Sequence, residues 1–142
     1  MMKVVCKVNN LNAFTDENVL KRLKRYISMP DGEIDREVDL EIDKEYTVYG
    51  VVFWDNSPWY YICTEEYVEY PKPFAAEFFS VSDQRLSSYW QLSVSNQGKR
   101  GPLSSLVFEP WAEEPSFYER LVDGDPEAEA VFAHFRRLMD NE

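Results

Sequence analysis

The feature that most constrains the fold is a strict alternation of acidic and other residues over positions 31–45. Every odd position in this stretch is acidic: Asp31, Glu33, Asp35, Glu37, Asp39, Glu41, Asp43 and Glu45. Several even positions are aliphatic, namely Ile34, Val38, Leu40 and Ile42. A period of two is typical of a β-strand, because successive side chains point to opposite faces. The pattern predicts a strand with carboxylates about 6.6 Å apart on one face, twice the rise per residue.

An aromatic β-hairpin is predicted directly after this acidic ladder. Residues 46–54 are rich in β-branched and aromatic side chains, which favours a strand, and residues 59–63 form the returning strand after a turn at 55–58. Gly50 inside the first strand indicates a bulge or bend, of the kind that curls a small sheet toward a barrel. Trp54 and Trp59 flank the turn, so we expect at least one of them to be exposed.

The remaining chain supplies further strands and helices. A helix is expected after Thr15 as its N-cap, ending near Met29, and Asp125 is expected to cap a C-terminal helix with Pro126 at its first position. A shorter helix is expected at residues 116–122. Strands are expected at residues 4–8, 89–94 and 103–108, and residues 74–81 form either a strand or a short helix.

This order of elements predicts an α+β fold. An antiparallel sheet, with the barrel-like curl as an option, would be accompanied by an N-terminal helix and one or two C-terminal helices. The length of 142 residues fits a single domain spanning residues 1–142.

The charge balance indicates which partners are favoured. Fifteen Lys and Arg residues stand against 26 Asp and Glu residues, for a formal net charge of −11. Such a surface repels nucleic acid and anionic membranes and attracts basic proteins, although acidity also serves solubility alone. Cys6 and Cys63 match no metal or redox spacing and are expected to be reduced. With no signal-like or membrane-spanning apolar run, a cytoplasmic location is expected.

Motifs of catalysis are not visible in the sequence. His134 is the one histidine, and neither cysteine has a plausible partner for a nucleophilic pair. No glycine-rich phosphate loop, nucleophile elbow or calcium loop is present. We therefore expect no enzyme activity, cofactor or metal. A hydrolase built on a desolvated carboxyl group is the enzymatic alternative.

The acidic ladder has two interpretations. It can be the solvent face of an edge strand, charged to prevent aggregation, or a surface for a basic partner, since adjacent like charges reduce stability. We favour the second, with the predicted binding residues Asp35, Glu37, Asp39, Glu41, Asp43, Trp54 and Trp59. A second acidic concentration spans residues 109–129, where eight carboxylates accompany Arg120 alone.

Several aromatic segments together resemble small bacterial immunity proteins of polymorphic toxin systems, including contact-dependent inhibition. They are YTVYGV at 46–51, WYYI at 59–62, the prolines Pro71 and Pro73, AEFF at 76–79, SYW at 88–90 and FYERL at 117–121. The resemblance spans roughly residues 37–122. It implies a cytoplasmic protein that binds a cognate toxin domain and blocks it without chemistry of its own, and whose acidity suits a basic nuclease.

The leading hypothesis is therefore a non-enzymatic immunity protein that complements a basic, nuclease-type toxin with its acidic face. The alternative is an SH3-like interaction module that binds a peptide through the aromatic hairpin. No motif is specific to one immunity family, so the activity of the toxin is left open, as is the oligomeric state.

Overall fold

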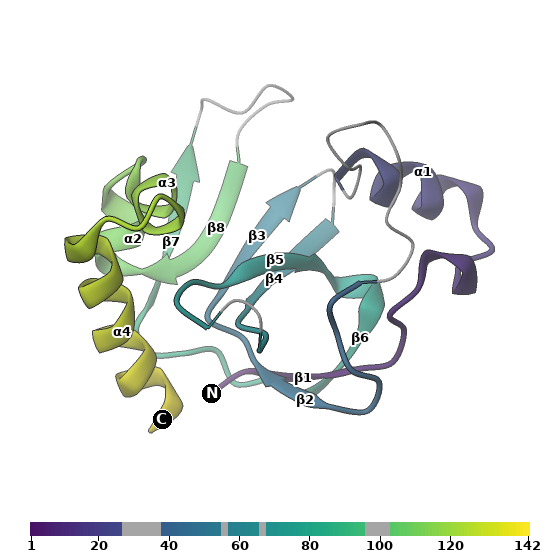
Figure 1. Ribbon diagram of the computed structural model, residues 1–142, viewed down its shortest axis with the longest axis horizontal. Helices are drawn as coiled ribbons and strands as arrows, with labels where there is room; N and C mark the ends of the chain where they lie inside the picture. The colour runs from purple at the N-terminus through teal and green to yellow at the C-terminus, as the bar shows by residue number, and fades with distance from the viewer. Residues whose placement is uncertain (27–37, 55–56, 66–67, 96–102) are drawn as a thin grey trace.

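Two antiparallel sheets form the centre of this computed structural model, and helices lie at both ends of them (Figure 1). The structure describes residues 1–26, 38–54, 57–65, 68–95 and 103–142; for residues 25 and 26 it describes the backbone alone. The predicted α+β fold and antiparallel pairing are confirmed. Both sheets are open, so the optional barrel-like curl does not close.

The smaller sheet has the strand order β2-β1-β6 and the larger one β5-β4-β3-β8-β7. The strands of the smaller sheet are β1 (Lys3–Cys6), β2 (Glu45–Thr47) and β6 (Phe79–Asp83). Those of the larger sheet are β3 (Gly50–Trp54), β4 (Ser57–Ile62), β5 (Lys72–Ala75), β7 (Trp90–Ser95) and β8 (Leu103–Phe108).

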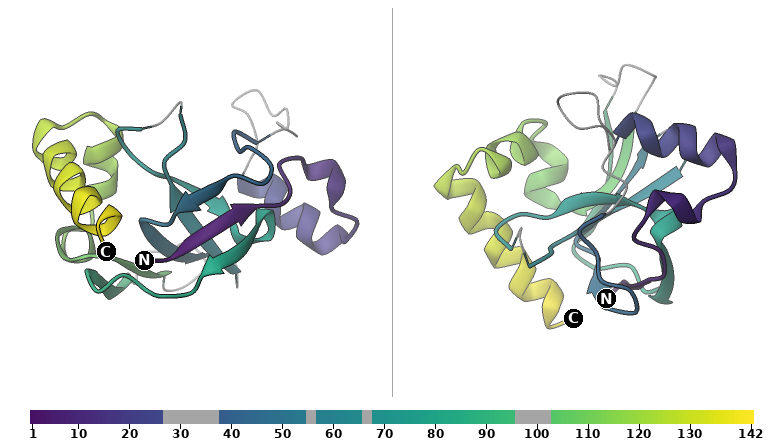
Figure 2. Two further views of the ribbon diagram at one scale, coloured as in Figure 1. Left: turned by 90° about the horizontal axis from the view of Figure 1, so that it is seen from below. Right: turned by 45° about the vertical axis from the view of Figure 1, so that its right-hand side comes forward.

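The helices divide into two groups, which Figure 2 shows from two further sides. Near the N-terminus are the short η1 (Leu11–Ala13) and α1 (Glu17–Tyr26); η2 (Ala76–Phe78) links β5 to β6. At the other end lie α2 (Glu109–Glu113), α3 (Phe117–Val122) and α4 (Pro126–Asp140). The sequence predicted α3 and α4 but not α2, where Pro110 occupies the first turn of the helix.

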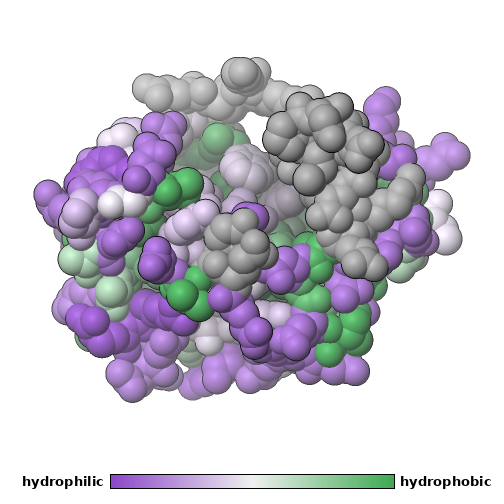
Figure 3. Space-filling model, in the orientation of Figure 1, coloured by the Kyte–Doolittle hydropathy of each residue, from purple (hydrophilic) through white to green (hydrophobic). Residues whose placement is uncertain are grey.

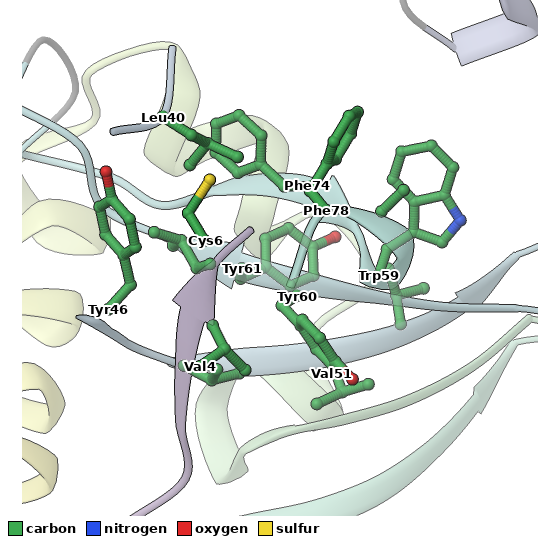
Figure 4. Packing of buried hydrophobic residues seen from close by; sticks show 14 of the residues in the cluster. Val4, Cys6, Leu40, Tyr46, Val51, Trp59, Tyr60, Tyr61, Phe74 and Phe78 are labelled. Atoms are coloured by element: carbon green, nitrogen blue, oxygen red, sulfur yellow. The ribbon is translucent and has the colours of Figure 1, made fainter. Parts of the chain in front are cut away.

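Two clusters of buried side chains hold these layers together. The first lies between the sheets and contains Val4, Tyr46, Tyr60 and Phe78 (Figure 4). The second packs the larger sheet against the C-terminal helices, through residues such as Phe108, Phe117, Leu121 and Phe132. Trp111 and Tyr118 contact both clusters, and so the helices are continuous with the packing of the sheets.

The predicted long strand over residues 46–54 is divided in the structure. Tyr46 lies in β2 and pairs with Val4 of the smaller sheet, whereas Gly50 begins β3 and pairs with Tyr61 of the larger sheet. The chain crosses from one sheet to the other at Val48 and Tyr49, both of which are buried. A local pattern cannot reveal this crossing. Both halves are rich in β-branched and aromatic residues, and distant strands decide which sheet each half joins.

Gly50 does not form the predicted bulge. Its pairing with Tyr61 continues in register through β3 and β4. A Cβ atom at this position would lie 3.0 Å from Cγ1 of Val107 and 3.3 Å from Cδ2 of Tyr61. The glycine is thus explained by close packing against β8 and β4 rather than by a bend.

Other local predictions have mixed outcomes. Asp125 caps α4 as predicted, accepting a hydrogen bond from the backbone N–H of Glu127. At α1 the prediction of Thr15 is wrong, because the carboxylate of Asp16 accepts from the N–H of Asn18 at 2.8 Å. Residues 74–81 combine both options, since β5, η2 and β6 follow one another. The predicted end of α1 near Met29 lies outside the described residues.

Candidate partner-binding surface

The acidic ladder is not a strand over the part that the structure describes. Asp31, Glu33, Asp35 and Glu37 lie outside the described residues. Residues 38–44 form a bend and a turn, in which Asp43 has a φ of 67°, and only Glu45 belongs to a strand. The prediction of a strand is therefore wrong for residues 38–44. The N–H of Asp43 donates to the carbonyl of Cys6 and the N–H of Cys6 donates to the carbonyl of Lys44, and these two backbone bonds hold the turn against β1.

The alternation of this segment nevertheless predicted burial in part. Leu40 and Tyr46 are buried, whereas Asp39 and Glu41 are exposed. Ile42 breaks the pattern, because the turn leaves it 48% exposed. A turn can thus imitate the alternation of a strand when a few of its side chains insert into a core.

Lysines offset several described carboxylates of the ladder. Lys44, from the ladder itself, bonds Glu41 at 2.8 Å and lies 3.6 Å from Glu65. Lys7, directly after β1, lies 3.4 Å from Asp43, and Lys3 of β1 lies 3.9 Å from Glu45. Such exposed pairs add little stability, but they reduce the negative potential that a basic partner would meet.

The two tryptophans expected at the hairpin tip differ in exposure. Trp59 is only 2% exposed, and its side chain belongs to the core between the sheets (Figure 4). Trp54 is half-buried and packs edge-on against Trp59, with ring centroids 5.8 Å apart. Trp59 therefore cannot present its ring to a partner as predicted, and Trp54 exposes only part of its own.

The strongest described acidic surface lies on the C-terminal helices instead. We call it the acidic helical surface and define it by the carboxylates Glu109, Glu113, Glu114, Glu119, Asp123, Asp125, Glu127 and Glu129 of α2, α3, the α3–α4 turn and the start of α4. The helices pack against one another at one end of the molecule (Figure 1). In Figure 3 the surface at that end is largely hydrophilic.

Arg120 is the only basic residue within this surface, and it is already engaged. Its Nε donates to Asp125 at 2.6 Å, and its guanidinium also pairs with Glu114 and Glu127. Glu109, Glu113, Glu119, Asp123 and Glu129 have no ion-pair partner within the part of the chain that the structure describes. All except Glu129 are exposed, so their field extends into solvent without local compensation.

The sequence indicated this surface through its second acidic concentration, at residues 109–129. The two acidic segments could not be ranked from the sequence, however, because only the fold brings Lys3 and Lys7 beside the ladder. Three of the described ladder carboxylates thus lie beside lysines, whereas five carboxylates of the acidic helical surface have no ion-pair partner among the described residues.

One cysteine and three tyrosines outside these surfaces are poorer nucleophiles than usual, because burial raises their pKa values. Burial raises the pKa of Cys63 to about 11. It also raises the pKa values of Tyr49, Tyr61 and Tyr118, with the bond to Asp140 adding to the shift at Tyr49. Groups shifted in this direction stay protonated at neutral pH, and a protonated thiol or phenol is a poor nucleophile.

The other potential sites offer little convergent chemistry. His134 is exposed on α4. Within the described ranges, no group of three or more His, Cys, Asp or Glu side chains is arranged to hold a metal ion. A hollow beside α1 is lined by Glu17, Leu20, Lys21 and Lys24, all from the same helix. None of the helices in the described part of the chain is both long and apolar enough to span a membrane.

Comparisons of the chain with protein-family models, with curated proteins and with solved structures find no match.

Proposed function

We propose that this protein is a non-enzymatic, cytoplasmic immunity protein that binds a basic toxin domain and neutralises it. The observation that carries the proposal is the acidic helical surface, in which four exposed carboxylates have no ion-pair partner among the described residues: Glu109, Glu113, Glu119 and Asp123. A concentrated negative field accelerates association with a positive cleft such as that of a nuclease. The resemblance of the aromatic segments to immunity proteins supports the class of partner.

This proposal moves the contact away from the surface that the sequence favoured. The described ladder carboxylates Asp39, Glu41 and Asp43 lie beside Lys7 and Lys44, or bond Thr64, and so contribute less field. Buried Trp59 supplies no anchor. Asp35 and Glu37 stay predictions, because they lie outside the described residues.

The test is a rescue experiment in cells that express whichever toxic C-terminal domain a reading frame beside this one encodes. One variant combines Glu109→Gln, Glu113→Gln, Glu119→Gln and Asp123→Asn, which remove the uncompensated charge while keeping side-chain size. Its matched control combines Glu41→Gln, Asp43→Asn, Glu45→Gln and Glu65→Gln, which remove the same charge from paired carboxylates. We expect the first variant to lose protection and the control to retain it.

Association rates of the purified proteins provide the quantitative measure. The helical variant should associate at least tenfold more slowly at low salt, since a rim charge acts mainly on the association rate, and wild-type association should slow as NaCl rises. Equal rates for the wild type and both variants would refute the proposal, as would the lack of any neighbouring toxin domain that the wild type neutralises.

The SH3-like adaptor is the second candidate. It requires accessible aromatic side chains on the β3–β4 hairpin, of which Phe53 is 42% exposed and Trp54 half-buried. Binding that is insensitive to salt and abolished by Phe53→Ala would favour the adaptor over the immunity protein.

A further inference from the structure

Strand β7 is an edge of the larger sheet without the usual protection. An edge strand leaves backbone N–H and C=O groups unpaired, and natural proteins shield such edges with charges, prolines or short length. The opposite edge, β5, carries Lys72 and Pro73. In the smaller sheet, β2 has three residues including Glu45, and β6 ends at Asp83. By contrast, β7 has six residues, no charge and no proline.

The exposed face of β7 is also apolar. Leu92 is 67% and Val94 is 58% exposed, and both point to the same face because they are two residues apart. Leu92 pairs with half-buried Leu106, while Val94 pairs with Ser104, beyond which lies Phe53 at 42% exposure. These residues form one apolar patch across three strands.

Helix α2 lies against the other face of the same strand. The hydroxyl of Ser93 donates to the carbonyl of Ala112 at 3.1 Å. The exposure of Leu92 and Val94 is thus confined to the face away from α2.

We propose that β7 pairs antiparallel with β7 of a second copy, about a two-fold axis through Ser93. In this register Leu92 of each copy lies opposite Val94 of the other, and Gln91 lies opposite Ser95. Both exposed aliphatic side chains then gain an aliphatic neighbour on the same face. The two larger sheets become one continuous sheet, and the contact is isologous, as a closed dimer requires.

The pattern of β7 suits a second copy, because the register about Ser93 places aliphatic residues opposite one another. Each copy has a net charge of −11, and two copies repel wherever their acidic surfaces meet. Residues 90–95 contain no charged side chain, so the strand itself adds no repulsion to the pairing. A basic partner gains no electrostatic attraction from β7 and would be drawn to the acidic helical surface instead.

The position of α2 predicts how dimerisation depends on the salt concentration. Ala112 contacts Ser93, on the proposed axis, and its neighbour Glu113 is exposed. The two copies of α2 therefore carry like charges toward each other, and screening should strengthen the dimer. Toxin binding, as proposed above, should weaken with salt, so the opposite salt dependences distinguish the two interactions, both of which involve Glu113.

Sedimentation equilibrium of the full chain tests the association at low and at moderate NaCl concentrations. We expect a monomer–dimer equilibrium that shifts toward the dimer with salt. The double variant Leu92→Lys/Val94→Lys should weaken dimerisation at least tenfold, with an unchanged circular dichroism spectrum. Ile42→Lys is the matched control, because Ile42 is 48% exposed but lies in the turn before β2. A wild type that stays monomeric at millimolar concentration would overturn the proposal, as would an unaffected double variant.

Disulfide trapping tests the register. Directly opposite residues of an antiparallel pair have Cα atoms about 4.5–5.5 Å apart, which suits a disulfide, and diagonal ones are farther apart. A mixture of Leu92→Cys and Val94→Cys should therefore cross-link faster under mild oxidation than either variant alone, with native protein as the control for Cys6 and Cys63. Equal cross-linking of the mixture and the single variants would refute the register centred on Ser93.

Discussion

At the scale of single residues, stability depends on a few tight contacts between strands. Gly50 is the clearest case, since Val107 on β8 and Tyr61 on β4 occupy the space beside its Cα atom. Packing acts differently at Cys63, where burial raises the pKa of the thiol and disfavours the thiolate. Both positions can be tested with small changes.

Gly50→Ala should destabilise the protein by about 1–3 kcal/mol, the usual range for overpacking a core. The added methyl group would lie 3.0 Å from Cγ1 of Val107 and force that side chain or the strand to shift. Urea unfolding monitored by tryptophan fluorescence measures the loss. In the double variant with Val107→Ala, the two effects should be less than additive, and full additivity would show that Val107 is not the source of the strain.

Cys63 should resist alkylation in the native state. Its pKa is raised by burial to about 11, so the neutral thiol that the fold favours persists at pH 8 and is lost only as the pH rises toward that value. The corresponding stability is present below the ordinary thiol pKa and declines above it. Iodoacetamide labelling at pH 8, followed by mass spectrometry, should be slow in buffer and fast in denaturant. Rapid native labelling would contradict the burial.

At the scale of elements, capping and packing fix the C-terminal helices in place while their outer face carries carboxylates. Asp125 caps α4 by accepting from the N–H of Glu127 at 3.3 Å, and it also receives the Nε donor of Arg120 at 2.6 Å. Phe117, Leu121 and Phe132 anchor α3 and α4 to the larger sheet. One face of these helices is therefore fixed by packing while the other is left free to carry carboxylates.

Asp125→Ala should cost about 1–2 kcal/mol, as expected for the loss of an N-cap. The guanidinium of Arg120 keeps Glu114 and Glu127 as partners, so the loss should not extend far beyond the cap. Asp123→Ala is the control, since Asp123 is exposed and lies one turn outside α4. Urea denaturation curves compare the two, and equal losses would contradict a capping role.

At the scale of the whole molecule, the net charge of −11 opposes the compact state. Ion pairs such as those of Lys44 and Arg120 offset part of this repulsion, but five carboxylates of the acidic helical surface have no ion-pair partner in the described part of the chain. Self-repulsion of this kind is screened by salt, whereas attractive surface pairs are weakened by it. The direction in which NaCl shifts the melting temperature therefore reveals whether repulsion or attractive pairs dominate.

We expect the melting temperature to rise as NaCl is increased from low to moderate concentration. The variant that neutralises Glu109, Glu113, Glu119 and Asp123 should melt higher at low salt and respond less to NaCl. The control variant at residues 41, 43, 45 and 65 should show a smaller change, because lysines already offset those carboxylates. Differential scanning fluorimetry is sufficient, and a melting temperature that falls with NaCl would show that attractive pairs dominate.

Local patterns in the sequence determined much of the fold. Alternation and β-propensity located β4, β7 and β8, and the Asp125–Pro126 pair located the start of α4, because these signals act within a few residues of the backbone they order. The net charge and both acidic concentrations were also visible, since they depend on composition alone.

Only the tertiary structure decided which of these side chains are exposed and which charges lie beside a counter-charge. Trp59 is buried because its side chain packs into the core cluster between the sheets, and Lys3 and Lys7 meet the ladder because β1 pairs beside β2. These contacts join residues far apart in the chain, and no local pattern encodes them. The charge that a surface presents depends on which residues the fold places beside it. For this reason the acidic helical surface is a better candidate for binding a basic partner than the described part of the ladder.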